Sequence, residues 1–166
     1  MPVPLAGPDG FLPLHTLLQI IPLSGSQGLE LTPYAARGLT QTIRQIGDAS
    51  NIKRTVIGTL VNATPPWFKQ YSTTITCRDT NAPCLDDAFR GEVVEIHCAG
   101  EFNYPVGGSP HRAQVSGSSR QEGHIMFYRP ILICMIKDIE PNFEEYEGYW
   151  SWRVEAEEVG LPAEQT

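Results

Sequence analysis

The sequence predicts an all-β fold, an antiparallel β-sandwich or barrel of about seven strands. Its 15 glycines and 14 prolines among 166 residues favour many turns over long helices. Several segments alternate apolar and polar residues with a period of two, which sends alternate side chains to opposite faces of a sheet. The longest uninterrupted apolar run, Ile131–Ile136, has six residues, whereas a membrane helix needs about 20. We therefore expect neither a helical bundle nor a membrane protein.

The chain length and composition fit one domain. Hydrophobic residues make up 41% of the chain and charged residues 19%, a balance typical of a globular protein with one core. We expect an extended, proline-rich N-terminal arm over residues 1–28, a single β domain over 29–159 and a C-terminal tail over 160–166. A long loop of mostly small or polar residues, 105–122, either orders against a neighbouring subunit or is plainly flexible, because loops of this length are usually functional or mobile.

The first strands follow from short β-rich segments. Thr16–Ile21 and Gly28–Thr32 are plausible strands. Arg37–Ile46 is ambiguous, because its apolar residues fit one helical face while its residues also alternate as in a strand; we favour the strand. Arg54–Val61 is rich in β-branched residues, and Tyr71–Arg78 alternates regularly. We expect these last two strands to pair through the connection that carries Trp67 and Phe68.

The later strands carry more apolar residues. Glu92–Gly100 alternates after a glycine that can supply a turn. Ile125–Ile136 becomes continuously apolar, as in a central strand covered on both faces, and Pro130 within it predicts a bulge or an edge position. Tyr146–Glu155 places Tyr146, Trp150 and Trp152 on one side, which we expect to be buried. A short helical turn is expected at Leu85–Phe89.

Charge is concentrated at the C-terminal end. The net charge of the chain is −7. Residues 138–166 hold nine acids and one arginine and so carry −8, whereas residues 1–137 carry +1. This layout disfavours direct binding of nucleic acid, which needs clustered Lys and Arg. The acidic end is either a solubilising face or a docking strip for a basic partner.

The residues offer no catalytic, cofactor-binding or metal signature. The N-terminus lacks the basic region of a secretory signal, so we expect a reducing cytosol and buried free thiols at Cys77, Cys84, Cys98 and Cys134. Zinc ligation by Cys77, Cys84, His97 and Cys98 is a weaker alternative because their spacing lacks a close cysteine pair. Three further patterns also favour structural roles: Cys84 with His111 or His124 as a nucleophile pair, adjacent Asp86 and Asp87, and the glycine-rich Gly107-Gly108.

Five segments resemble small virion proteins encoded among the tail genes of tailed bacteriophages: Leu31–Ile43, Arg54–Val61, Ser72–Cys77, Ser116–Arg120 and Phe127–Pro130. The similarity spans most of the chain, from Leu31 to Val159, and carries no catalytic residues. It implies a structural protein of the tail or baseplate that is made in the bacterial cytoplasm, forms a ring of copies around the tail tube and contacts other virion proteins, such as tube, sheath or hub.

The leading hypothesis is therefore a structural virion protein that is not an enzyme and needs no cofactor. Its contacts are expected in Pro2–Pro13, Pro105–Glu122 and Glu155–Thr166, through sheet edges, extended arms and the acidic end. The alternative is a soluble binding module whose aromatic face, including Trp150 or Trp152, holds a glycan or peptide. A small cysteine- or metal-dependent enzyme is a third hypothesis.

Overall fold

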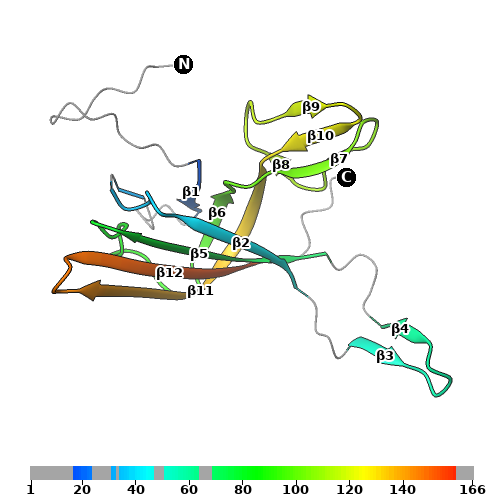
Figure 1. The fold of residues 1–166 in the computed structure, drawn as a ribbon, viewed down its shortest axis with the longest axis horizontal. Coiled ribbons are helices and arrows are strands. Elements are labelled where there is room, and N and C mark those ends of the chain that lie inside the picture. Colours follow the sequence, from blue (N-terminus) through cyan, green and yellow to red (C-terminus); the bar gives the residue numbers. More distant parts are fainter. Residues whose placement is uncertain (1–16, 24–30, 33, 47–50, 64–68, 160–166) are drawn as a thin grey trace.

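The computed structural model describes residues 17–23, 31–32, 34–46, 51–63 and 69–159, which form twelve strands and no α-helix (Figure 1). The all-β prediction is confirmed. Within this part of the chain no helix is long and apolar enough to cross a membrane. The strands are β1 (Gln19–Pro22), β2 (Thr40–Gln45), β3 (Ile52–Arg54), β4 (Leu60–Asn62), β5 (Tyr71–Asp79), β6 (Val93–His97), β7 (Phe102–Pro105), β8 (Ala113–Gln114), β9 (Arg120–Glu122), β10 (Ile125–Tyr128), β11 (Pro130–Glu144) and β12 (Tyr149–Glu158).

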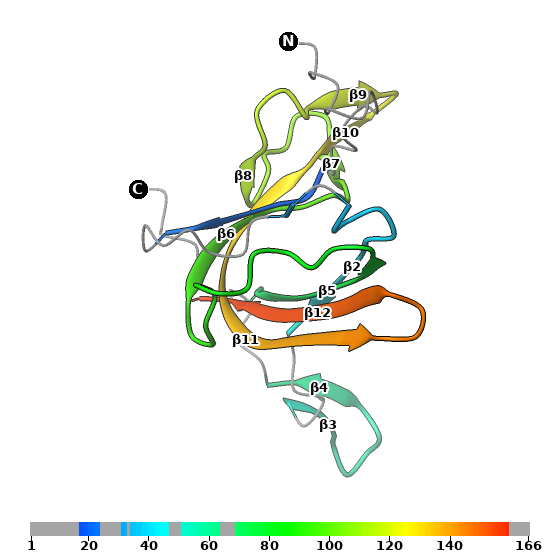
Figure 2. The ribbon, with the colours of Figure 1, turned by 90° about the vertical axis from the view of Figure 1, so that its left-hand side faces the viewer.

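Seven strands form the main antiparallel sheet. Its order is β1-β6-β11-β12-β5-β2, and β8 pairs with the start of β11. The 15-residue strand β11 connects the two halves: its first part pairs with β6, and most of its length pairs with β12 across a bulge between Ile136 and Asp138. Figure 2 shows β11 bending so that the two halves of the sheet face each other. A three-stranded sheet, β7-β10-β9, and the separate hairpin β3–β4 complete the fold.

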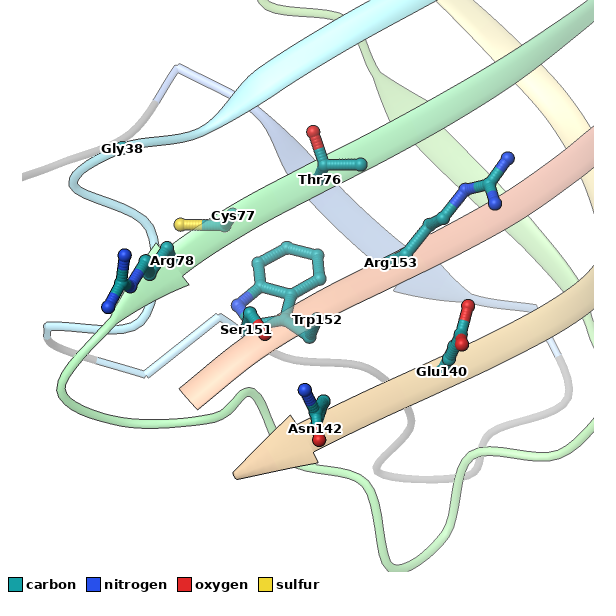
Figure 3. Close-up of a pocket in the computed structure, with 9 residues that line it drawn as sticks. All are labelled: Gly38, Thr76, Cys77, Arg78, Glu140, Asn142, Ser151, Trp152 and Arg153. Carbon is teal, nitrogen blue, oxygen red and sulfur yellow. The ribbon is translucent and has the colours of Figure 1, made fainter. Parts of the chain in front are cut away.

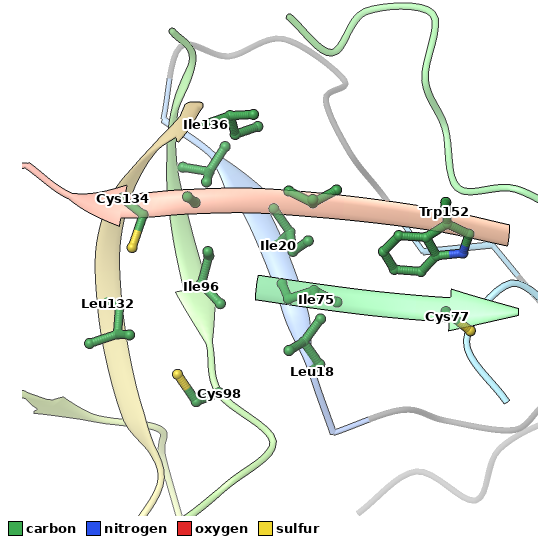
Figure 4. Packing of buried hydrophobic residues seen from close by; sticks show 13 residues of the cluster. Leu18, Ile20, Ile75, Cys77, Ile96, Cys98, Leu132, Cys134, Ile136 and Trp152 are labelled. Carbon is green, nitrogen blue, oxygen red and sulfur yellow. The ribbon is translucent and has the colours of Figure 1, made fainter. Parts of the chain in front are cut away.

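The core lies on the inner face of this bent sheet (Figure 4). Alternate residues of each strand point into it, as the period of two requires. The Trp152 ring is 2% exposed and its Nε1–H donates to the carbonyl oxygen of Ala35 at 2.9 Å, which satisfies the indole inside an apolar environment. The fully buried aliphatic members include Leu18, Ile75, Val94, Ile96, Leu132, Ile136 and Val154.

Two polar links hold the connecting segments over this core. The Arg37 guanidinium and backbone N–H donate to the Asp79 carboxylate at the end of β5, at 2.7–3.2 Å. Burial opposes ionisation of Asp79, but hydrogen bonds from Arg37 and Thr80 outweigh it and hold the pKa of this carboxyl below its usual value. On β2, Gln41 Oε1 accepts a hydrogen bond from the N–H of Ala99 at 2.9 Å, so the β2 edge is tied to the end of β6.

Several predicted strands are confirmed, with shifted ends. The ambiguous segment Arg37–Ile46 contains strand β2, and β1, β5, β6 and β12 lie in predicted strand segments. Strand β1 falls inside the expected N-terminal arm and is an edge of the main sheet. Residues 24–30 lie outside the described part, and Leu31 and Thr32 are not in a strand. Leu85–Phe89 makes a turn, with the Ala88 N–H donating to the Leu85 carbonyl at 3.3 Å.

The prediction of one strand over Arg54–Val61, paired with Tyr71–Arg78, is wrong. The chain reverses at Gly58, whose φ of 85° suits glycine, and strands β3 and β4 pair with each other. Strand β5 pairs instead with β2 and β12. The β-branched residues correctly indicated extended backbone. Strand propensity does not determine which other strand a segment pairs with.

The prediction of one strand over Ile125–Ile136 is also corrected. The chain divides at Arg129 into β10, which belongs to the three-stranded sheet, and β11, which begins at Pro130. This position suits a residue without an N–H donor. Strand β11 is central, but only one of its faces is covered, because Ile133 and Met135 on the other face are 38% and 40% exposed.

Three smaller expectations need correction. Strand β12 begins at Tyr149, so Tyr146 lies in the preceding turn and is fully exposed, while Trp152 is the buried aromatic residue of that side. The segment 105–122 is not a plain loop, since it contains β8 and β9. Cys84 is exposed, whereas Cys77, Cys98 and Cys134 are buried as expected.

Candidate interaction surfaces

The hairpin β3–β4 exposes apolar side chains with no cover from the rest of the described chain. We call residues 51–63 the basic hairpin, because they include Lys53 and Arg54 and no acid. Every residue of its two strands is exposed. At its turn, Val56 and Ile57 are 107% and 88% exposed. An isolated two-stranded hairpin is at best marginally stable in water, so this surface is suited to contact with another molecule.

Local hydrogen bonds define the turn of the basic hairpin. The Thr55 N–H donates to the Thr59 carbonyl at 2.8 Å, and the Gly58 N–H donates to the Thr55 carbonyl at 2.9 Å. Arg54 Nη1 also donates to the Gly58 carbonyl at 3.0 Å. These bonds fix the turn, so Val56 and Ile57 are presented at a defined tip.

A second exposed surface lies where β11 and β12 meet. We call residues 140–150 the acidic tip, because they carry four glutamates and no lysine or arginine. Tyr146 is 100% exposed, Phe143 48% and Tyr149 43%. The ring of Phe143 packs on Trp150, with centroids 5.0 Å apart. The tip therefore combines negative charge with accessible aromatic rings, and aromatic residues are enriched at protein interfaces.

The base of the acidic tip is fixed by Arg78 of β5. Its guanidinium pairs with Glu147, lies 3.6 Å from the Glu144 carboxylate and sits 5.0 Å from the centre of the Tyr149 ring. A backbone hydrogen bond from the Gly148 N–H to the Glu144 carbonyl, 2.8 Å long, closes the turn. Glu140 and Glu145 make no hydrogen bond or ion pair within the described chain, so their charges are available to a partner.

The basic hairpin and the acidic tip lie at opposite ends of β5. The basic hairpin follows β2 in the chain, and Gln45 at the end of β2 pairs with Tyr71 at the start of β5. At the far end of the same strand, Asp79 pairs with Trp150 of the acidic tip. Eight residue steps along a strand correspond to about 26 Å. Figure 1 shows the two hairpins projecting in different directions from the body.

A shallow groove with a mixed polar and apolar lining crosses the sheet beside the acidic tip (Figure 3). It has a volume of about 460 Å³. Its polar wall comes from three neighbouring strands: Thr76 and Arg78 of β5, Ser151 and Arg153 of β12, and Glu140 and Asn142 of β11. The groove extends the exposed area of the tip over the sheet and contains no arrangement of a nucleophile with a base.

A second pocket, of about 290 Å³, lies at the junction with the three-stranded sheet, where the rings of Tyr71, Phe102 and Tyr128 line it together with polar and charged side chains. Tyr71 packs on Phe102 with centroids 5.3 Å apart, and Phe102 meets the edge of Tyr128. Behind them, the 7%-exposed Arg112 and Glu158 side chains form an ion pair at 2.7 Å. The hydrogen bonds that Arg112 donates to the Glu158 carboxylate raise the pKa of Arg112, so the guanidinium stays charged.

The residues considered for zinc do not come together. Cys77 and Cys98 are part of the apolar core, while Cys84 is exposed on a connecting segment. The His97 side chain points away from the core and its Nε2 lies 2.6 Å from a Glu95 carboxylate oxygen. In the part of the chain that the structure describes, no three His, Cys, Asp or Glu side chains are grouped so that they could hold a metal.

Burial also suppresses the reactivity of two cysteines. It raises the pKa of the Cys98 thiol to about 11 and raises that of Cys134 further. A thiol that stays protonated is a poor nucleophile. Their positions in the core cluster beside Leu132 and Ile96 make them packing residues.

Of the three segments predicted to make contacts, two lie largely outside the described residues. These are Pro2–Pro13 and the part of Glu155–Thr166 beyond Val159. The third, Pro105–Glu122, contributes β9 to the three-stranded sheet and β8 to the main sheet. Sequence reasoning missed the basic hairpin. The glycine inside a β-branched run, at Gly58, was the signal that could have revealed it.

Comparisons of this chain with protein-family models, curated proteins and solved structures found no match.

Proposed function

We propose that this protein is a structural subunit of a bacteriophage tail or baseplate. It assembles with other copies of itself as a ring around the tail tube and contacts neighbouring virion proteins. It is made in the host bacterial cytoplasm, works without a cofactor and catalyses no reaction. The assignment to phage tails rests on the resemblance of the segments between Leu31 and Val159 to tail-gene products.

The observation that carries the assembly role is the basic hairpin. Its aliphatic residues, including Val56 and Ile57, are more exposed than any residue of the sheet core. Large apolar patches on a soluble protein usually mark an interaction site. In chain order the hairpin lies between β2 and β5. A projecting hairpin of this kind can contact a neighbouring copy. When a contact between two different surfaces of the same chain repeats from copy to copy, the copies can close into a ring.

The test is the mass of the full chain in solution, measured by light scattering over a wide range of concentrations. We expect association that increases with concentration. The Val56→Asp, Ile57→Asp double variant should remain monomeric where the wild type associates. The matched control is Val106→Asp, Ile125→Asp, which changes two exposed aliphatic residues at one end of the β7–β10 strand pair and should associate like the wild type. A wild-type chain that stays monomeric at every concentration would contradict the proposal.

The assignment to a virion has a separate test. Mass spectrometry of purified tailed particles from a host that produces this protein should detect it in fixed ratio to the tail-tube protein. Its absence from intact particles would remove the tail role while leaving self-association in place.

A second candidate function is a glycan- or peptide-binding module, favoured by the pocket at the junction with the three-stranded sheet, which combines aromatic rings with polar and charged side chains. Tyr71 and Tyr128 line that pocket beside Arg112, whereas Trp152 is buried and has no surface for a ligand. Binding of an oligosaccharide or peptide that is lost in Tyr71→Ala, in a chain that stays monomeric, would favour this candidate over assembly.

A further inference from the structure

The two exposed hairpins are complementary in charge and in apolar character. The basic hairpin has two positive charges and no negative one, and the acidic tip has four negative charges and no positive one. Aliphatic Val56 and Ile57 are exposed on the first, and aromatic Phe143 and Tyr146 on the second. Complementary potentials steer association and fix its register.

We propose that the basic hairpin of one copy docks on the acidic tip of the next copy, in a head-to-tail contact. This inference rests on the proposed assembly function and names its interface. Lys53 and Arg54 approach Glu140 and Glu145, and the aliphatic turn packs on the exposed rings of the tip. The occupant of the acidic tip is therefore a second copy of this chain.

The placement of the two hairpins supports a contact between copies. They lie at opposite ends of β5. The basic hairpin follows Gln45, which pairs with Tyr71 at the start of β5, and the acidic tip includes Trp150, which pairs with Asp79 at its end. In the structure they project away from each other (Figure 1). A surface at one end that fits a surface at the other end of the same molecule produces a heterologous interface, the kind that builds rings when it closes.

The acidic tip also offers backbone groups. Strand β6 pairs with β11 only as far as Met135, and Ile136 bonds to the backbone of Glu92. Beyond that point, residues 137–144 of β11 have a strand partner on one side only, β12, among the described residues. An incoming strand such as β3 can add to this edge, because an unpaired edge is a template for a further strand.

Charge reversal tests the inference. The hairpin variant is Lys53→Glu, Arg54→Glu, and the tip variant is Glu140→Lys, Glu145→Lys. All four side chains are exposed, so both variants should fold. We expect each variant alone to associate at least about tenfold more weakly than the wild type, because like charges then face each other. Wild-type association should also weaken as salt is added.

Mixing the two variants is the decisive experiment. The reversed hairpin of one fits the reversed tip of the other, and the unchanged hairpin fits the unchanged tip, so a 1:1 mixture should regain association. A chain with all four reversals should regain it alone. Light scattering reports the mass in each case.

The outcomes separate the two proposals. A wild-type chain that is monomeric at every concentration overturns both, and it is also the result expected if the hairpin folds back on its own chain. If the wild type associates and the tip variant associates equally well, only the head-to-tail contact is overturned. Association would then use a hairpin-to-hairpin contact or another surface. Variants that weaken association without restoring it on mixing also overturn the pairing.

Discussion

The main sheet and the basic hairpin use the same kinds of residues with opposite exposure. In the sheet, Ile75 and Val154 are 0% and 1% exposed, whereas Val56 and Ile57 in the hairpin are 88–107% exposed. The sheet thus gains stability from burial within one chain. The hairpin gains almost none, because its apolar side chains are left exposed. Substitutions in the sheet should lower the free energy of unfolding, and substitutions in the hairpin should weaken association.

The largest loss is expected for Trp152→Ala. The change removes a buried ring and leaves the Ala35 carbonyl without its indole donor, so the free energy of unfolding should fall by about 4 kcal/mol. Urea unfolding followed by fluorescence or circular dichroism measures this loss.

Trp150→Ala provides the control on the same strand. Trp150 is only half-buried and packs on Phe143 at the surface, so its loss should be clearly smaller. An equal loss of unfolding free energy in both variants would mean that the core is not centred on the buried side chain of Trp152.

A loss of about 3 kcal/mol is expected for Arg112→Met, because it leaves the Glu158 carboxylate buried without its charge partner. The Tyr71 N–H also donates to Glu158, at 2.7 Å, so the start of β5 should loosen with it. Urea unfolding measures the loss, and hydrogen exchange at Tyr71 locates it.

The double variant Arg112→Met, Glu158→Leu sharpens this result. Replacing both charges removes the uncompensated carboxylate, so the double variant should be more stable than Arg112→Met alone. A double variant that is less stable by the sum of two single losses would contradict a coupled ion pair.

The same contrast explains what could be predicted from the sequence. Alternation located β5, β6 and β12, because one face of each strand is buried and burial leaves a period of two in the residues. It did not reveal where the chain changes sheets at Arg129, because β10 and β11 are continuous in composition and differ only in their partners. Strand pairing is set by contacts between residues far apart in the chain, which local propensity does not encode.

The candidate interaction surfaces were predictable only in part. The excess of acid after Asp138 predicted either a solubilising face or a docking strip for a basic partner, and four of its glutamates form the acidic tip. The basic hairpin was missed because an exposed β-branched run has the same local composition as a half-buried strand. Only the position of Gly58 distinguishes the two, by its positive φ.

A loss of about 2 kcal/mol at neutral pH is expected for Asp79→Asn, since hydrogen bonds to a charged carboxylate are replaced by weaker ones. The pKa of Asp79 is lowered on folding. The stabilisation is therefore present above the ordinary Asp pKa of about 3.9 and is lost as the pH falls through the lower, folded value. Unfolding in urea at neutral and acidic pH should show the two proteins converging in acid. A difference that is constant with pH would exclude the charge as its cause.

The smallest effect on folding is expected for Val56→Asp, Ile57→Asp. Neither side chain is buried, and the turn is held by backbone bonds between Thr55, Gly58 and Thr59. The free energy of unfolding of the monomer should therefore change by less than about 0.5 kcal/mol, measured in urea at a concentration too low for association. A loss approaching that of Trp152→Ala would show that the hairpin packs against its own chain, and the contrast with the sheet would fail. An unchanged monomer that no longer associates would place the role of these residues in the contact between molecules.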